Sequence, residues 1–555
     1  MVLIYDCVWG DSMEYVRTPR RTRSSRDRGK RERLFYAKID EIEPSDEGRL
    51  LVVFSAINAR SDGLWNAGPD SYFAIHNNPD DSVDAITRSV DQIRENVTKY
   101  WDRAFDYDFD TLDSVDDPLS QLSICRITIV IESNHSIFQV RDRFNTWFRI
   151  RLDEVVDNNP RTTLPSIGFA LSTWHYGFQW DAAQLRRFID AQVCSQQESA
   201  AMEAVLYAQG LHRHDASISQ LEIALKPLKR MDQCICFNVG QGLCVGLADC
   251  YGRVLAYSDY GHGLYSKGGG TTPHSLRYCR HESNPAPVIL SHWHFDHYAG
   301  AYRKVGKPVK NGVWVLPPVG SSLRPGSMRL VKTLIDAKCT ILPFPNLIKA
   351  NQPATMTITT QAGQKIALTQ CTGSLTGNPN ECGIAVNVEN TNPDGTLSKW
   401  VLPGDASYDS FIDPFPNAVI AAVVAAHHGG KISPFNLPQR PNAGYARLLF
   451  SFGKDNNYGI PCTVEAATRS AYQKKQWVFP SNWTNAAVKP PLPSYVDVLS
   501  TATWEKKQPV SPTAPITHIA ATWTGQEKVD DSHLQACFTM SLYKNCPKQT
   551  FRILR

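Results

Sequence analysis

The sequence predicts an α/β protein of two or three domains. Its 555 residues exceed what a single hydrophobic core usually holds. Short apolar runs of strand length alternate with segments whose apolar residues recur at helical spacing. Three of the apolar runs, at 287–290, 399–402 and 418–426, lead within a few residues into histidine or aspartate. Ligand-type residues at the ends of several strands indicate a functional site.

The composition is that of an ordinary globular protein. Hydrophobic residues make up 42% of the chain and charged residues 20%, and the net charge is +4. A charge this small on a chain this long neither demands nor excludes a polyanionic partner. The 14 cysteines are scattered without a repeated spacing, and no cysteine pair flanks a histidine pair as in a zinc finger. A reducing, cytoplasmic location is therefore expected.

No segment predicts insertion into a membrane. Asp6 interrupts the apolar start of the chain too early for a secretory signal. The longest wholly apolar run, 418–426, is about half of what a membrane-spanning helix requires.

A short predicted strand and a basic run form the first segment, 1–33. The run contains far more basic than acidic residues, alternating with Ser, Thr, Pro and Gly. Such a segment cannot bury a core by itself. Its arginines, Arg20, Arg21 and Arg23 among them, can contact the phosphates of a nucleic acid. A solvated loop without a partner is an equally good interpretation.

Residues 34–228 are predicted to form an α+β domain of their own. The β-branched runs at 51–57 and 124–131 predict strands. Apolar residues spaced by three and four across 83–100 predict an amphipathic helix, and the Ala, Gln and Glu content of 188–207 predicts a second helix. No catalytic constellation is visible here. The domain can serve as a docking or sensing module for a protein partner or regulator.

The remaining chain, 229–555, is predicted to form the second domain. It begins with two apolar strands on either side of Gly-Gln-Gly at 240–242, where the glycines allow a tight turn or a close backbone approach. A further strand leads to Asp259. Cys234 and Cys236, at alternate positions of an apolar strand, are predicted to belong to the core and not to a metal site.

A histidine-rich segment follows the apolar run at 287–290. It places His292, His294, Asp296 and His297 within six positions. Imidazole and carboxylate are ligands of borderline divalent ions such as Zn²⁺. In an extended segment His292 and His294 project to the same side, whereas Asp296 and His297 lie where the chain can turn into a helix. One segment can therefore serve two adjacent metal ions.

Two further strand ends supply candidate ligands. A predicted hairpin, whose second strand is 399–402, delivers Asp405. A carboxylate at the exit of a buried strand is costly unless it is paired or coordinated, so a bridging metal ligand is its natural role. The run 418–426 ends at His427 and His428, and the sequence leaves open which of them coordinates.

The order of these motifs resembles the metallo-β-lactamase fold superfamily, and most closely the hydrolase domain of the ComEC-like DNA-uptake competence proteins. The match covers 234–483, and the membrane segments of the competence proteins have no counterpart here. The motifs that carry the resemblance are the glycines of 240–242, Asp259 with Gly261, the segment 292–297, Gly404 with Asp405, and His427-His428-Gly429.

The resemblance implies an αββα sandwich for the second domain, with two divalent metal ions at one edge. Zn²⁺ is the expected ion and Mn²⁺ an alternative, and a metal-bound hydroxide would attack the substrate. The implied metal ligands are His292, His294, Asp296, His297, Asp405 and His427. Asp296 and His428 would take part in catalysis. Four residues would border the site or the substrate: Asn380, Asp259, Lys431 and Tyr458.

Two departures from the family pattern concern this site. Many members carry a further histidine between the segment that corresponds to 292–297 and the bridging aspartate, whereas 298–426 contains none. Asn380 takes that place, as in competence-like members. The two histidines of the family's Tyr-Gly-His-Pro-His segment are Ile460 and Cys462 in this sequence.

Three functions are compatible with these motifs. A metal-dependent phosphodiesterase acting on nucleic acid is the leading interpretation, because the resemblance points to a nuclease-associated branch and the basic run can contact a phosphate backbone. A hydrolase of small phosphoesters or other esters is the second, since a fold does not fix a substrate. The third is a degenerate metal-binding protein with a regulatory or interaction role.

Overall fold

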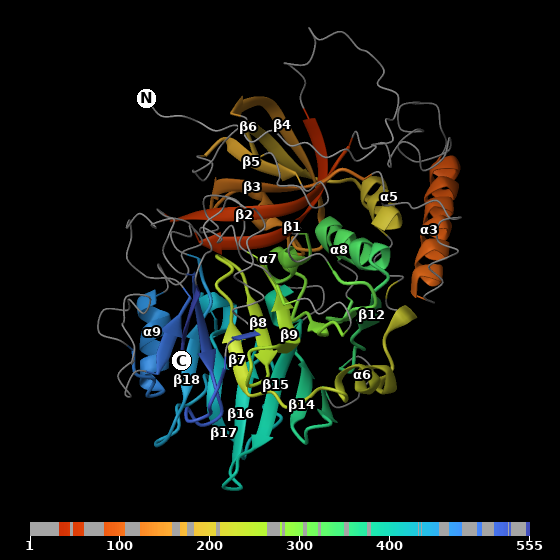
Figure 1. Ribbon diagram of the computed structural model, residues 1–555. Coiled ribbons are helices and arrows are strands. Elements are labelled where there is room, and N and C mark those ends of the chain that lie inside the picture. The colour runs from red at the N-terminus through yellow and green to blue at the C-terminus, as the bar shows by residue number, and fades with distance from the viewer. Residues whose placement is uncertain are drawn as a thin grey trace, which may run out of the picture.

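A computed structural model shows the N-terminal part of the chain as a β-barrel stacked on two further sheets (Figure 1). Strands predominate over helices, so the chain is a mixed α/β protein, as the sequence predicts. The structure describes residues 33–44, 48–59, 83–105, 122–157, 167–174, 183–206, 211, 213–262, 278–279, 284–302, 308–319, 323–348, 354–373, 379–430, 432–433, 436–453, 465–479, 497–501, 516–530, 532–533 and 551–555.

The N-terminal strands close into a barrel. In the described part of the chain six strands take part, in the order β1 (Arg33–Pro44), β2 (Arg49–Asn58), β3 (Ile124–Glu132), β5 (Phe169–Trp174), β6 (Ala183–Val193) and β4 (Trp147–Asp157). The barrel closes because β1 pairs on both edges, with Phe35 opposite Asn58 on one side and Ile150 on the other. Alternate side chains point inwards, and Phe35 and Ile39 are fully buried there.

The helix predicted at 188–207 is wrong for its first part. Residues 188–193 belong to strand β6, and helix α5 (Gln196–Leu206) begins only after two intervening residues. The Ala-, Gln- and Glu-rich composition describes the helix alone, whereas the strand is fixed by antiparallel pairing with β4 and β5. Helix α3 (Val83–Phe105) and strands β2 and β3 confirm the other elements predicted in this part.

The rest of the chain forms two sheets. Within the described residues the first has eight strands, in the order β12 (Thr340–Pro343), β11 (Val313–Leu316), β10 (Val288–Ile289), β9 (Val254–Tyr260), β8 (Cys244–Ala248), β7 (Gln233–Cys236), β20 (Ile516–Ala521) and β21 (Phe551–Leu554). The second has seven, in the order β13 (Thr355–Thr359), β14 (Lys365–Gln370), β15 (Ile384–Thr391), β16 (Leu397–Leu402), β17 (Val419–Val424), β18 (Arg447–Phe450) and β19 (Val498–Ser500). The predicted hairpin that leads to Asp405 is the antiparallel pair β15 and β16.

One apolar core joins the two sheets. Leu247 and Ile289 of the first sheet share it with Val386 and Trp400 of the second, and all four are fully buried. The Trp400 indole stacks on that of Trp523, with ring centroids 3.7 Å apart. Complete burial of large apolar side chains is worth about 1.5–3 kcal/mol each. This core therefore holds the sheets against each other and keeps their strand ends in place.

Helix α6 (Ile218–Leu225) packs into the same core. Leu221 and Leu225 are fully buried in it, together with Ala216 just before the helix. The sequence predicts the domain border at 228, but residues from 216 onwards already pack with the two sheets.

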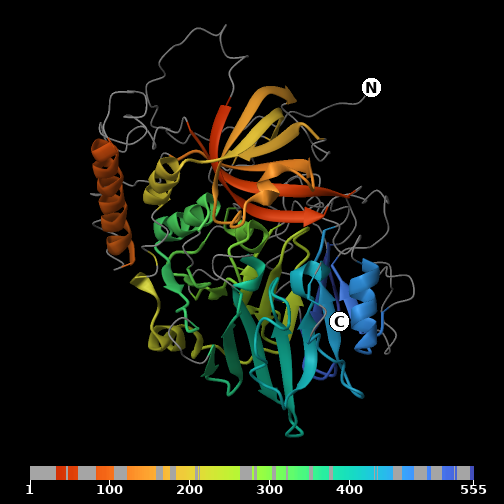
Figure 2. The same cartoon turned by 180° about the vertical axis from the view of Figure 1, so that it is seen from behind.

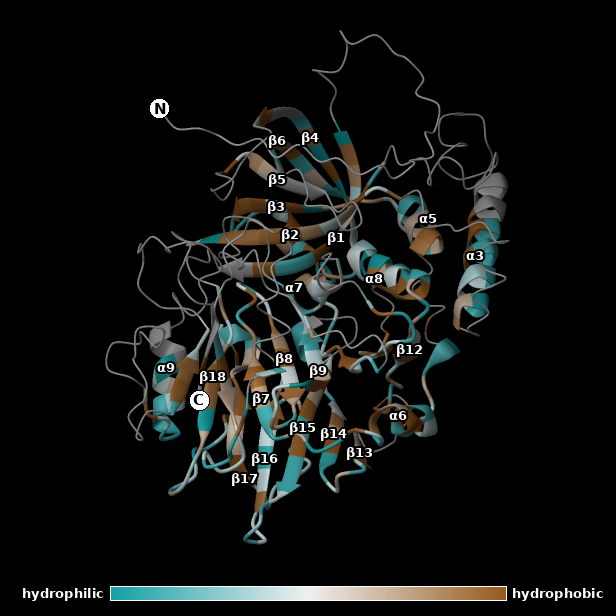
Figure 3. Cartoon of the chain, in the orientation of Figure 1, coloured by the Kyte–Doolittle hydropathy of each residue, from teal (hydrophilic) through white to brown (hydrophobic). Residues whose placement is uncertain are grey.

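Helices cover the outer sides of the sheets. Helix α8 (Pro325–Asp336) buries Leu330 in a cluster that includes Trp314 of the first sheet and residues of α3 and α5. Helix α9 (Glu465–Lys474) contributes Tyr472 to a cluster beside the second sheet. Figure 2 shows α3 and α9 on opposite sides of the molecule, and Figure 3 shows apolar residues concentrated in the strands. The short helices are η3 (Ser136–Gln139), α7 (Phe295–Tyr298), η6 (Ala299–Tyr302), η7 (Pro379–Glu381) and η8 (Ala426–Gly429).

The barrel rests on the end of the sheets where α7 and α8 begin (Figure 1). The backbone N–H of Gly326 donates to Ser55 Oγ at 2.8 Å. Arg324 Nε donates to the carbonyl oxygen of Ile39 at 3.0 Å and lies 3.6 Å from Asp40 Oδ1. Arg324 is only 3% exposed and Asp40 only 4%. A buried polar contact therefore fixes the barrel over this end of the sheets.

Every cysteine that the structure describes is a free thiol. Cys234 and Cys236 are fully buried in β7, and burial raises the pKa of the Cys234 thiol to about 12, so both belong to the core as predicted. Among the described helices, none is both long and apolar enough to cross a membrane. The strand and basic run predicted before residue 33, with Arg20, Arg21 and Arg23, lie outside the described residues.

Candidate metal centre

Three chain segments converge at the end of the sheets that faces the barrel. Strand β10 is followed by His292 and His294, and then by α7, which carries Asp296 and His297. Strand β16 leads to Asp405, and β17 leads to η8 with its two histidines. All of these side chains are buried.

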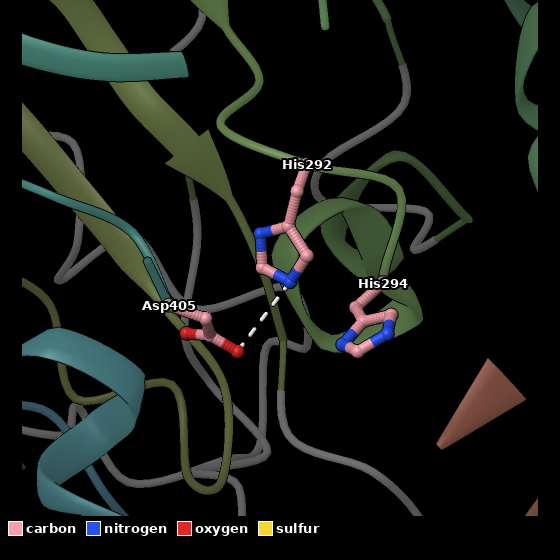
Figure 4. A group of neighbouring side chains, drawn as sticks. All are labelled: His292, His294 and Asp405. Carbon is pink, nitrogen blue, oxygen red and sulfur yellow. Dashed lines mark ion pairs between the residues drawn. The ribbon is translucent and has the colours of Figure 1, made fainter. Parts of the chain in front are cut away.

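His292, His294 and Asp405 form one group (Figure 4). One ligand-type atom from each of them lies within 4.8 Å of the others. His292 Nε2 is 3.4 Å from Asp405 Oδ2. Figure 4 shows both imidazoles on one loop, with Asp405 coming from a different segment. His294 has an extended backbone, which places the two histidines on the same side as the spacing predicts.

Asp296, His297 and His428 form a second group with the same 4.8 Å limit on their ligand-type atoms. His428 Nε2 lies 3.1 Å from Asp296 Oδ2, and His297 Nε2 lies 3.9 Å from Asp296 Oδ1. Two members of this group come from α7, and the third lies in η8, after β17 of the second sheet.

Asp405 lies between the two groups. Its Oδ2 atom faces His292, whereas its Oδ1 atom is 3.1 Å from His297 Nε2 and 3.7 Å from His428 Nε2. Each group therefore receives one oxygen of the same carboxylate, which is the geometry that a bridging ligand requires.

The inner atoms of both groups lack hydrogen-bond partners. In the described part of the chain this holds for the Nε2 atoms of His292, His294, His297 and His428 and for Asp405 Oδ1. Leaving a buried polar atom without a partner costs about 1–3 kcal/mol. Divalent cations would satisfy all of these atoms at once, so the donor set fits a metal such as Zn²⁺ or Mn²⁺.

The outer ring nitrogens of two of these histidines, in contrast, are held in place. His428 Nδ1 lies 2.9 Å from the carbonyl oxygen of Ser451, which can only accept, so this nitrogen carries the proton. His292 Nδ1 lies 3.0 Å from Ser291 Oγ. Such contacts orient the ring and direct Nε2 inwards, as is usual around ligating histidines.

Asp259 orients the third imidazole. Its Oδ2 atom lies 2.9 Å from His297 Nδ1 and accepts from Ser291 Oγ at 2.8 Å, while its Oδ1 accepts from Ser291 N at 2.6 Å. The carboxylate is fully buried, and its backbone has a φ of 62°, a region that Asp tolerates better than most residues. The predicted neighbour of the site thus contacts a candidate ligand directly.

The charges of the site follow from burial and from one another. Burial lowers the pKa of His292 and His294, which keeps both imidazoles neutral and able to donate a lone pair. Burial also opposes charge on His297, but the surrounding carboxylates, Asp405 first, raise its pKa well above the usual value. Burial likewise opposes charge on Asp405, and the surrounding histidines hold its pKa well below the usual value. The cluster therefore favours an anionic Asp405 facing a cationic His297, with neutral His292 and His294 beside them.

The turn after β17 directs the two adjacent histidines to different places. His427 and His428 both have positive φ, 50° and 56°, which is uncommon outside glycine. This turn brings His428 into the second group. His427 Nε2 lies outside both groups, 3.9 Å from Asp405 Oδ2 and 3.4 Å from Asn380 Nδ2. The family resemblance implies His427 as a metal ligand and His428 as a catalytic residue, whereas the structure groups His428 with Asp296 and His297 and leaves His427 beside Asp405.

Two glycines make room for the loop that carries the histidines, residues 291–296. A Cβ on Gly261 would stand 1.9 Å from the carbonyl oxygen of Asp296, and a Cβ on Gly404 would stand 2.5 Å from Ser291 Oγ. Gly404 also has a φ of 63°. These close approaches explain why glycine stands beside the aspartates in both motifs.

The other predicted neighbours divide into two sets. Asn380 is buried beside His427, at the border of the site. Lys431 and Tyr458 lie outside the described residues. Ser291 and Ser451 were not predicted, and the sequence holds no signal for them, because one acts through a hydroxyl and the other through a backbone carbonyl.

The metal centre thus consists of two adjacent His/Asp groups, either of which could hold a metal ion. Comparison with family models, with curated proteins and with solved structures finds no match to this chain.

Proposed function

We propose that the chain is a hydrolase of the metallo-β-lactamase type that uses two divalent ions to cleave phosphodiester bonds of nucleic acid. The observation that carries this proposal is the pair of buried His/Asp groups on either side of Asp405, with inner atoms that lack partners in the described part of the chain. Two adjacent cation sites suit displacement at phosphorus, where both the attacking and the leaving oxygen need stabilisation.

The architecture is compatible with an αββα sandwich. The two sheets share one core, and α8 and α9 lie on their outer sides. The candidate ligands come from loops that follow β10, β16 and β17 at one end of the sheets. Together with the motif order in the sequence, this arrangement supports the metallo-β-lactamase type over an unrelated metal-binding fold.

The chain's own residues would hold and orient the reacting groups. His292, His294 and Asp405 would hold one ion, and Asp296, His297 and His428 the other. Bound ions would supply Lewis acidity and lower the pKa of a water molecule toward about 7. With an ion bound at Nε2, the remaining ring proton of His297 would lie on Nδ1, where the Asp259 carboxylate can accept it.

His427 is the residue we assign to the substrate. It borders Asp405 without joining either group, and Asn380 lies beside its Nε2 atom. From there it can donate a proton to the leaving oxygen or bind a phosphate oxygen.

The adjacent histidines allow a matched test of these roles. His428→Gln should lose bound metal and activity together, whereas His427→Gln should keep the metal content of the wild type and lose activity. Elemental analysis and a cleavage assay on each variant separate the two effects. If His427→Gln loses metal while His428→Gln keeps it, the assignment of the two roles is contradicted.

The substrate class is tested by comparing the cleavage of nucleic-acid polymers with the hydrolysis of small esters. We expect cleavage of single-stranded or double-stranded DNA or RNA with Mn²⁺ or Zn²⁺, and binding of the polymer that weakens steeply as salt rises, because phosphate contacts release counterions. Bis(p-nitrophenyl) phosphate and p-nitrophenyl acetate serve as small substrates. Efficient hydrolysis of these esters without any polymer cleavage would replace the nuclease by a small-ester hydrolase.

A further inference from the structure

A cavity lies away from the candidate metal centre, on the outer face of the seven-stranded sheet. Its volume is about 430 Å³, within the range of small-ligand pockets. Strands β15, β16 and β17, which lie side by side in Figure 1, form its floor through Asn387, Val401 and Ile420. Tyr408 and Phe411 line it as aromatic walls. Val401 belongs to the apolar cluster that includes Tyr472 of α9, whereas the preceding residue, Trp400, belongs to the core between the sheets. Val401 and the cavity therefore lie on the outer face of the sheet.

Asn387 distinguishes this cavity from an ordinary surface hollow. Its side chain is buried, with 1% exposure, and it lines the cavity. Neither its Oδ1 nor its Nδ2 has a hydrogen-bond partner among the described residues. A buried amide without partners destabilises the fold, so such a group indicates a partner that is not part of the chain.

Asn390, on the same strand, shows how an asparagine is usually accommodated. Its Oδ1 accepts from Gln364 Nε2 at 3.0 Å, and its Nδ2 donates to Asn392 Oδ1 at 3.1 Å. The same amide group is therefore satisfied by protein at one position of β15 and aimed into a cavity at another.

The charged residues around the cavity are already paired. Lys399 Nζ binds the Asp413 carboxylate and donates to the Phe415 carbonyl oxygen at 2.8 Å. Arg440 holds both oxygens of Asp497, at 2.7 and 3.1 Å. Among the described lining residues no cation is left over to bind a phosphate or carboxylate, so the cavity favours a neutral ligand.

We propose that this cavity binds a neutral planar heterocycle whose edge presents a hydrogen-bond donor beside an acceptor, as a nucleobase does. The Asn387 amide offers the complementary acceptor and donor, the arrangement by which asparagine binds adenine in two hydrogen bonds. Tyr408 and Phe411 supply faces on which a flat ring can stack. None of the lining residues belongs to the two metal-ligand groups, so the proposal does not depend on the metal chemistry.

The test uses adenosine, guanosine, cytidine and uridine as probes, with saturation-transfer NMR and calorimetry on the full chain. At least one nucleoside should bind, and indole, which has a donor without an adjacent acceptor, should bind at least tenfold more weakly. The matching 5′-monophosphate should gain no affinity over its nucleoside. Binding of none of the four nucleosides, or a tighter-binding monophosphate, would overturn the proposal.

Two leucine variants serve as the matched pair. Asn387→Leu should weaken nucleoside binding at least tenfold while its melting temperature stays the same or rises, because a buried amide without partners is removed. Asn390→Leu should bind nucleosides like the wild type but melt at a lower temperature, because it breaks two hydrogen bonds. If Asn387→Leu binds nucleosides as the wild type does, or is destabilised as much as Asn390→Leu, the amide is already satisfied and the site is excluded.

Discussion

Asp259→Asn tests how the candidate centre orients its ligands. In the native protein Asp259 only accepts, and its Oδ2 lies 2.9 Å from His297 Nδ1. An asparagine can keep the positive φ and the contact with Ser291 N, but its Nδ2 can only donate. His297 Nδ1 must then accept, which moves the ring proton to Nε2, the atom 3.1 Å from Asp405 Oδ1. A protonated Nε2 cannot bind a metal.

Changes to residues that orient a ligand typically cost 10- to 100-fold in metal affinity, or about 1.4–2.7 kcal/mol. We expect a loss of this size for Asp259→Asn, measured by competition of Zn²⁺ between the protein and a fluorescent chelator. Asp249→Asn is the control, because its carboxylate caps the turn of Tyr251 and Arg253 and belongs to neither ligand group. Equal Zn²⁺ affinity of the Asp259 variant and the wild type would show that Asp259 does not set the tautomer of His297.

Three further predictions concern packing and pH. Gly261→Ala should lower both metal content and melting temperature, because its Cβ would stand 1.9 Å from the Asp296 carbonyl oxygen; wild-type values for both would show that the loop can move. Asp40→Ala should lower the free energy of unfolding by about 3–5 kcal/mol in a urea titration, because it removes the buried carboxylate that faces the Arg324 guanidinium; a loss under 1 kcal/mol would show that this ion pair contributes little to stability. Burial lowers the pKa of His518 to about 3 from 6.5, so below pH 6.5 the unfolded chain takes up a proton that the native chain does not. Its contribution to stability is complete above pH 6.5 and should fall by about 1.4 kcal/mol per pH unit between 6.5 and 3. Urea titrations of His518→Gln at pH 7 and pH 5 should lack this part of the decline, and an unchanged decline would contradict the assignment.

The strands and ligand-type side chains that converge at the candidate metal centre are encoded locally in the sequence. A buried run leading into His292, Asp405 or His428 combines two strong signals, an apolar strand and a cluster of ligand-type side chains. Asp405 contacts His292, His297 and His428 because three strands end at the same place, and the sequence pattern predicts where each strand ends.

The choice between His427 and His428 is not local in the same way. It depends on two successive residues with a left-handed backbone conformation. Neither these histidines nor their neighbours predict that conformation from the sequence. The orienting contacts are hidden for a similar reason, since Ser451 acts through its backbone oxygen.

The barrel could not be predicted because its closure depends on distant pairing. Phe35 lies opposite Ile150, and no local pattern fixes that register. The same holds for 188–193, whose strand is held by pairing with β4 and β5. The helix-favouring composition of the residues that follow predicts a helix there instead. The unpartnered amide of Asn387 is also invisible in the sequence, where it is one polar residue in an apolar strand.

Elemental analysis decides whether the two His/Asp groups bind metal. The full chain is stripped with a chelator, reloaded with Zn²⁺ or Mn²⁺, freed of excess ion and analysed beside Asp405→Asn. We expect two ions per wild-type chain and one or fewer in the variant, because Asp405 contacts both groups. Less than one ion per wild-type chain after reloading, or the same content in both proteins, would contradict this expectation.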